Sequence, residues 1–263
     1  MAMNARLVGS GKVTLVLAHG YGGSQSVWDA VVPELSQRYQ LLLFDWSFSG
    51  AISPPAAFDS PEHCSFEFFA DVLISLLLRF GLKGVVFVGH SMSGMIGCAA
   101  YIKKPELFRH LVLVASSPRY INSDKYDGGF DLCNIESIIN NIESNFHAWV
   151  EDFGKAVMAT EDPHALQNYL QSFKGMNPKT ALALAKTIFY SDQRHLLQHV
   201  WLPCTIVQGT QDIAVSVAVG RYMQSKIKGK TSVEIVEGSG HFPQLTCKEK
   251  FIEIINRTLM PYM

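Results

Sequence analysis

The sequence predicts an α/β fold with a mostly parallel, doubly wound sheet and helices on both of its faces. Two observations lead to this prediction. Short runs of apolar residues occur without polar alternation, which is typical of strands that are buried on both faces. Segments with helical spacing of apolar residues separate these runs, and such alternation favours a parallel sheet. The runs cover residues 14–18, 41–44, 85–88, 111–114, 205–207 and 233–236.

The segments between the runs have the spacing of helices. Residues 26–38 carry Val27, Val31 and Leu35 at intervals of four, so we expect one helix there. The same reasoning predicts further helices over residues 66–80, 94–104, 217–226 and about 248–259.

Residues 116–200 interrupt this alternation. They contain no convincing strand, and they carry four helical runs near residues 135–145, 146–158, 163–173 and 178–190. Pro163 and Pro178 stand where proline suits the first turn of a helix. Because the segment lies between two strands, it should project from their carboxyl edge, where ligands bind in open α/β sheets. We therefore predict a core of residues 1–115 and 201–263, with residues 116–200 inserted as a four-helix lid.

Composition excludes several classes of protein. The chain has 263 residues, of which 48% are hydrophobic and 17% charged, and its net charge is −1. We therefore expect a globular protein that binds neither nucleic acid nor an anionic membrane. The first six residues lack the apolar stretch of a signal peptide, and residues 66–82 are too few and too charged to span a bilayer. Five scattered cysteines without a CxxC pair indicate reduced thiols, as in the cytoplasm or nucleus.

A serine stands at the turn between one predicted strand and the following helix. Gly89-His90-Ser91-Met92-Ser93 follows the apolar run 85–88. In such a turn the backbone is strained, and the serine hydroxyl is pushed out of the sheet. The usual pattern is Gly-x-Ser-x-Gly, and Ser93 is small enough to meet the need for close packing at its last position.

Two further residues complete a candidate catalytic triad. A serine hydroxyl needs an imidazole as base, and the imidazole needs a carboxylate to orient it. Asp212 follows the strand 205–207 and His241 follows the strand 233–236, so both should reach the same sheet edge as Ser91. The chain order Ser91, Asp212, His241 is that of α/β-hydrolases. Taken singly, Asp212 could be a solvated turn residue and His241 an ordinary loop histidine, but the joint pattern favours a triad.

The loop His19-Gly20-Tyr21-Gly22-Gly23 follows the first predicted strand. We expect the backbone amides of Tyr21 and Met92 to form an oxyanion hole for acyl transfer. A glycine-rich loop can also hold phosphate, but the Walker lysine and the GxGxxG spacing are absent from the sequence. His195 and His199 are four residues apart without a third ligand, so we expect neither a metal nor a cofactor.

Six segments carry a family resemblance, namely residues 25–28, 89–97, 116–122, 128–130, 187–192 and 240–245. In them the sequence closely resembles the plant karrikin/strigolactone receptor family, whose scaffold the bacterial RsbQ-type regulators share. The likeness runs nearly end to end, and the chain is more similar to the karrikin-receptor-like members than to the strigolactone receptors.

This resemblance implies an α/β-hydrolase fold whose four-helix lid covers a site for butenolide signals, which such proteins hydrolyse slowly. It implies partners of two kinds, an F-box protein with leucine-rich repeats and a repressor related to Clp-type ATPases. Ser91, Asp212 and His241 match the family's triad. The positions that match its ligand pocket are Tyr21, Tyr120, Phe130, Trp149, Phe153, Phe189 and Ile213.

The chain departs from the family in places. Residues 45–55 differ from the usual Asp-x-x-Gly-x-Gly turn, and Tyr21 stands where phenylalanine is usual. Met92 replaces the usual valine and Gly94 the usual alanine.

Three functions keep this triad. The first is a butenolide receptor with an active triad, in the cytoplasm and nucleus and as a monomer. The second is an ordinary metabolic esterase or lactonase that acts on small hydrophobic esters. The third is a binding module in which the triad only shapes the pocket. The aromatic residues of the insertion could also form its packing core, and this alternative applies to Trp149 and Phe153 in particular.

Overall fold

Seven strands form one sheet in the computed structural model, which describes residues 3–53 and 61–263. Pro54 and Pro55, which end the segment that departs from the family pattern, lie outside these residues. The sheet order is β1-β3-β2-β4-β5-β6-β7, with β1 antiparallel to β3 and every other pair parallel. The strands are β1 (Arg6–Val8), β2 (Thr14–Ala18), β3 (Gln40–Leu43), β4 (Val85–His90), β5 (Phe108–Val114), β6 (Cys204–Gly209) and β7 (Thr231–Val236).

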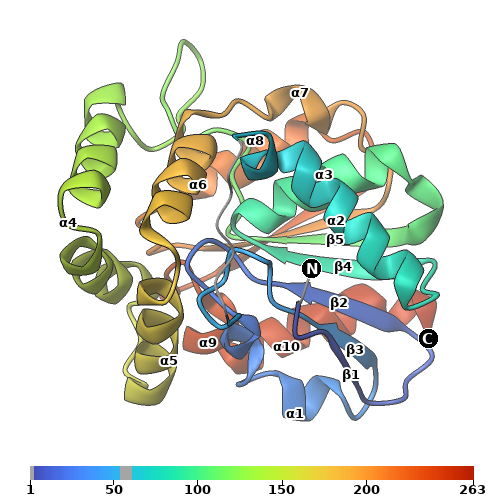
Figure 1. Ribbon diagram of the computed structural model, residues 1–263. Coiled ribbons are helices and arrows are strands. Elements are labelled where there is room, and N and C mark those ends of the chain that lie inside the picture. The colour runs from blue at the N-terminus through green and yellow to red at the C-terminus, as the bar shows by residue number, and fades with distance from the viewer. Residues whose placement is uncertain (1–2, 54–60) are drawn as a thin grey trace.

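The sheet confirms the predicted parallel α/β architecture. The central strands β4 and β6 are buried along their whole length, as expected for apolar runs without polar alternation. In Figure 1, α2 (Phe66–Arg79) and α3 (Met92–Lys103) lie above the sheet, and α1 (Val32–Leu35) and α10 (Lys248–Leu259) lie below it. The other core helices are α8 (Val217–Lys226) and the short α9 (Pro243–Thr246).

The single helix predicted for residues 26–38 is wrong. The structure has a 3₁₀ turn at Gln25–Trp28, and α1 then begins at Val32. Pro33 lies in the first turn of α1. A continuous helix would place Pro33 in its interior, where proline lacks an amide donor and clashes with the preceding turn. The edge strand β1, whose residues are largely exposed, was not predicted because three residues carry too little apolar pattern.

Residues 116–200 contain helices α4 (Leu132–Met158), α5 (Pro163–Lys174), α6 (Pro178–Tyr190) and α7 (Arg194–Leu197). In α4 the backbone leaves helical geometry at Asn145, with φ −154° and ψ 77°. The Asn145 side chain there accepts a hydrogen bond from the amide of Ala148, so it caps the second half of the helix. This kink coincides with the boundary between two predicted helical runs. Figure 1 shows α4, α5 and α6 stacked together at the left, beside one end of the sheet.

The apolar core surrounds both faces of the sheet and continues into α4, α5 and α6. Its largest side chains with no more than a trace of exposure include Trp28, Trp46, Phe87 and Phe173. Among the described residues, no helix combines the length and the apolar character needed to cross a bilayer.

Candidate active site

Ser91 lies at a strained turn between β4 and α3. Its φ of 56° and ψ of −126° fall in a region that residues with a side chain rarely adopt. The Ser91 amide donates a 2.8 Å hydrogen bond to the carbonyl of Val114 on β5, which fixes the turn to the neighbouring strand. Strain of this kind is found at functional sites, where the surrounding structure maintains it. The side chain of Ser91 is therefore held at the carboxyl edge of the sheet.

Asp212 and His241 lie in contact at the same edge. His241 Nδ1 is 2.9 Å from Asp212 Oδ2, and the Asp212 side chain has no exposed surface. The other carboxylate oxygen, Oδ1, accepts hydrogen bonds from the amides of Ala214 and Val215 at 2.8 and 3.0 Å. Gln208 Nε2 donates to Oδ2 at 3.0 Å. These donors fix the carboxylate, which can in turn orient the imidazole of His241.

These surroundings determine the ionisation states of Asp212 and His90. Burial alone would raise the pKa of Asp212, but the charge and hydrogen bond of His241 and the two amides hold that pKa below its ordinary value. Burial and the neighbouring His241 lower the pKa of His90 to about 3, so this ring is neutral near pH 7. His90 Nε2 donates a 2.9 Å hydrogen bond to the carbonyl of His241. The neutral His90 ring therefore braces the backbone of His241.

Ser91 and His241 line the same cavity, but the described residues include no hydrogen bond between their side chains. The side chain of Tyr120 lines this cavity together with Ser91. Catalytic hydrogen bonds are often long in proteins without a ligand and tighten when substrate binds.

The loop His19–Gly23 lies directly against Ser91. A Cβ atom on Gly20 would be 2.8 Å from Cβ of Ser91 and 3.1 Å from Nδ1 of His90, so this close approach requires glycine. Within the described residues, the Tyr21 amide donates to no protein group. Met92 is the first residue of α3, where amides have no intrahelical acceptor. Both amides that we predicted for the oxyanion hole are thus available as donors.

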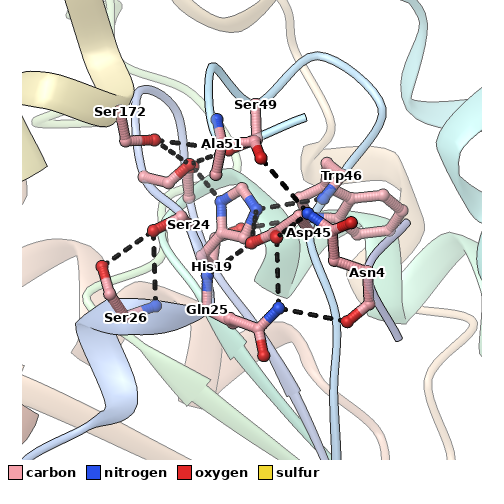
Figure 2. A network of polar contacts seen from close by, with 12 residues as sticks. Asn4, His19, Ser24, Gln25, Ser26, Asp45, Trp46, Ser49, Ala51 and Ser172 are labelled. Atoms are coloured by element: carbon pink, nitrogen blue, oxygen red, sulfur yellow. Dashed lines mark hydrogen bonds and ion pairs between the residues drawn. The ribbon is translucent and has the colours of Figure 1, made fainter. Parts of the chain in front are cut away.

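A network of polar contacts stabilises the loop His19–Gly23 (Figure 2). The hydroxyl of Ser93 donates to the carbonyl of His19 at 2.5 Å, and the Trp46 indole donates to the same carbonyl at 3.0 Å. His19 Nε2 accepts the backbone amide of Trp46 at 3.0 Å. The hydroxyls of Ser49 and Ser172 both donate to the carbonyl of Gly23, at 2.8 and 3.0 Å. The His19 ring therefore has a structural role, because it binds the backbone of Trp46. Trp46 belongs to residues 45–55, the segment that departs from the family pattern.

The cavity beside Ser91 has a volume of about 40 Å³. Five residues predicted for the pocket line it: Tyr21, Tyr120, Phe130, Phe153 and Phe189. The cavity has further lining residues that no sequence pattern predicted, and these are His90, Ile138, Val157, Tyr169, Ile188, Ala214 and Phe242. These residues come from elements that meet only in the folded chain, although His90 and Phe242 are sequence neighbours of the triad.

Trp149 and Ile213 do not line this cavity, so the prediction is corrected for both. The Trp149 ring stacks on Phe153, with centroids 4.7 Å apart, and its edge contacts Phe173. It therefore packs behind the cavity wall, in the core of the helical segment. The side chain of Ile213 is 55% exposed, because the turn that buries Asp212 directs the next residue to the surface.

Comparison with known proteins places the chain in a family. The model of the alpha/beta hydrolase fold matches residues 13–246. Strigolactone esterase D14 of Arabidopsis thaliana is 34% identical over 98% of this chain and 96% of its own length. Karrikin insensitive 2 receptor CA of Petunia hybrida is 38% identical over 97% of this chain and 95% of its own. The chain belongs to the α/β-hydrolase family that includes the plant karrikin and strigolactone receptors. A hydrolase from Oleispira antarctica has a similar structure, with a TM-score of 0.91, 28% identity and coverage of 98% and 94% of the two chains.

Among the described residues, no group of three His, Cys, Asp or Glu side chains could hold a metal ion. A larger open cleft, of about 410 Å³, lies beside His110, Thr205 and Tyr262 at the amino ends of β6 and β7. None of its lining residues belongs to the Ser91 site, so we place the chemistry at the smaller cavity.

Replacing Gly22 with alanine should destabilise the protein. Gly22 has a φ of +74°, and a Cβ atom there would lie 2.4 Å from the Phe173 ring on α5. Gly81 has a φ of +65° with no atom within 4 Å of such a Cβ, so Gly81→Ala is a matched control. Both variants should lose about 1–2 kcal/mol for the left-handed backbone, and Gly22→Ala about 1–3 kcal/mol more for the clash. Urea unfolding measures this difference, and equal losses would contradict the close packing of α5 on the loop.

Proposed function

We propose that the protein is a receptor for small butenolide ligands that also hydrolyses them slowly as a serine hydrolase. The observation that carries this proposal is the buried Asp212–His241 pair beside Ser91, in an apolar cavity walled by α4, α5 and α6. The receptor and esterase names of the relatives support it. Apolar walls with a few polar groups suit a small hydrophobic lactone.

The chemistry would proceed in two steps. Ser91 Oγ attacks the ester or lactone carbonyl while its proton moves to His241 Nε2, and Asp212 stabilises the resulting imidazolium. The amides of Tyr21 and Met92 hold the negative oxygen. When the carbon–oxygen bond breaks, the leaving alkoxide takes the proton from His241 and an ester of Ser91 remains. Water, deprotonated by His241, then hydrolyses this ester and restores the serine.

The small volume of the cavity should limit the rate of ligand hydrolysis. Pockets for small molecules usually enclose about 300–1,000 Å³, so a butenolide requires the aromatic walls to move apart. These walls include Phe153 on α4 and Phe189 on α6. We propose that this rearrangement makes turnover slow and gives a bound ligand a means to change the surface of the helical segment.

The same proposal includes protein partners and a location in the cell. By family resemblance, an F-box protein with leucine-rich repeats and a Clp-ATPase-like repressor would bind the liganded form. The protein would act as a monomer in the cytoplasm and nucleus, where the free thiols, such as buried Cys98 and Cys204, remain reduced.

An experiment with a synthetic enol-ether butenolide tests the proposal. Product release, melting temperature and intact mass are followed for the wild type and for Ser91→Ala. The receptor proposal expects slow product release and a lowered melting temperature in the wild type, with no release by Ser91→Ala. Fast multiple turnover with an unchanged melting temperature would instead identify an ordinary esterase. Ligand binding without product in either protein would identify a binding module.

A further inference from the structure

The side chain of Tyr21 connects the oxyanion loop to the helical segment. Its hydroxyl donates a 2.8 Å hydrogen bond to the carbonyl of Ala181, in the first turn of α6. The two residues are 160 positions apart in the chain. The amide expected to meet the oxyanion belongs to this same residue. One residue therefore carries both a contact with α6 and a group expected to act on the substrate.

The other two large helices of the segment also contact Tyr21. The Tyr21 ring lies edge-on against Phe173 of α5, with centroids 4.8 Å apart, and 6.5 Å from the Trp149 ring of α4. The hydroxyl of Tyr169 on α5 donates to the Tyr21 carbonyl at 3.4 Å. Tyr21 is thus held on its ring, its hydroxyl and its carbonyl, all by residues of the helical segment.

Of the two hydrogen bonds that join Tyr21 to the helical segment, the one to α6 is the shorter, at 2.8 Å against 3.4 Å for the one from Tyr169. Burial raises the pKa of Tyr21 well above its ordinary value, so the phenol keeps its proton and remains a donor. The acceptor is a main-chain carbonyl, which moves with the helix as a unit. A displacement of α6 is therefore transmitted to the loop through Tyr21.

We propose that the Tyr21 hydroxyl is a positioning group that sets the oxyanion amide according to the place of α6. This inference rests on the proposed function, because it assumes that the Tyr21 amide meets the oxyanion. When α6 occupies the place seen here, the amide is aligned for catalysis. When α6 moves to admit a ligand, the amide moves out of this alignment, so the chemical step is slowed for as long as α6 is displaced.

The variant Tyr21→Phe tests this directly, since it removes only the hydroxyl. Tyr39→Phe is the matched control, because Tyr39 is fully buried and its hydroxyl donates a 2.8 Å hydrogen bond to Asn256 on α10, and neither residue lines the cavity beside Ser91. The substrate is p-nitrophenyl acetate. We expect kcat to fall about tenfold in Tyr21→Phe, with KM within about twofold of the wild type, because misalignment weakens binding of the transition state more than of the ground state.

A boronic acid gives an independent readout. Phenylboronic acid forms a tetrahedral adduct with an active serine and places an oxygen in the oxyanion hole. Its inhibition constant should rise about tenfold in Tyr21→Phe, in parallel with the fall in kcat. In Tyr39→Phe both quantities should stay at the wild-type value, while the melting temperatures of the two variants should be similar.

Three results would overturn the inference. If kcat and the inhibition constant of Tyr21→Phe equal those of the wild type, the hydroxyl does not position the amide. If KM rises while kcat is unchanged, the hydroxyl binds substrate and has no positioning role. If Ser91→Ala hydrolyses the ester at the wild-type rate, the proposed function fails and this inference fails with it. Loss of activity in Ser91→Ala together with normal Tyr21→Phe kinetics would remove the positioning role alone.

Discussion

Ser91→Ala should lower kcat/KM for p-nitrophenyl acetate by about 10⁴-fold or more, because removing the nucleophile of a triad abolishes the acyl-enzyme route. The residual rate would come from the oxyanion amides and from ligand positioning. The backbone at Ser91 is held by the hydrogen bond that its amide donates to the carbonyl of Val114, and alanine retains this bond. We therefore expect the melting temperature to remain close to that of the wild type.

A control separates this effect from the loss of any buried hydroxyl near the turn. Ser116 is fully buried near the nucleophile strand, and its hydroxyl donates to the carbonyl of Gly89 at 3.3 Å. Ser116→Ala should keep most of the hydrolytic activity. Equal losses in both variants would indicate a disturbed turn and would argue against Ser91 as the nucleophile.

Asp212→Asn should lower kcat/KM by about 10⁴-fold with little change in fold, because an amide favours the wrong tautomer of the histidine and cannot stabilise its charged form. Since the pKa of Asp212 is held below its ordinary value, its carboxylate stays ionised as pH falls below about 4, the ordinary value for aspartate. In the wild type, Asp212 should therefore not set the acid limb of the pH–rate profile.

Asp71→Asn is the matched control for Asp212→Asn. Asp71 forms a surface ion pair with Lys103 at 2.7 Å, and its side chain is 63% exposed. Its loss should leave kcat/KM unchanged, since exposed pairs contribute little. Activity of Asp212→Asn within tenfold of the wild type would show that Asp212 does not orient a catalytic histidine.

Local sequence patterns predicted much of the fold. Continuous apolar runs predicted the buried strands, because a strand covered on both faces needs apolar residues at every position. Pro163 and Pro178 correctly marked the starts of α5 and α6, where Asp162 and Asn177 also cap the first amides. The prediction failed at residues 26–38, where Pro33 outweighed a good apolar spacing.

Only part of the candidate site could be predicted from the sequence. Ser91, Asp212 and His241 follow strand ends, and parallel strands bring such positions to one edge. The structure places all three there, with a hydrogen bond between the last two. The packing of side chains from different helices has no such local signal. Tyr169 was therefore missed, and Trp149 was placed in the pocket although it packs behind Phe153.

The link between Tyr21 and α6 also depends on contacts across the fold. The sequence predicted a role for the Tyr21 amide, but it gave no sign that the hydroxyl meets Ala181. We propose that this contact couples the displacement of α6 on ligand entry to the position of the oxyanion amide. It offers a physical reason why a complete triad could turn over slowly.

Labelling with a fluorophosphonate tests the central claim most directly, namely that His241 and Asp212 activate Ser91. The serine oxygen displaces fluoride from phosphorus, so a covalent adduct forms only on an activated hydroxyl. We predict one adduct per chain by intact mass, located on the peptide that contains Ser91, absent from Ser91→Ala and much slower to form in Asp212→Asn. An unlabelled wild type, or the same adduct on Ser91→Ala, would contradict the claim.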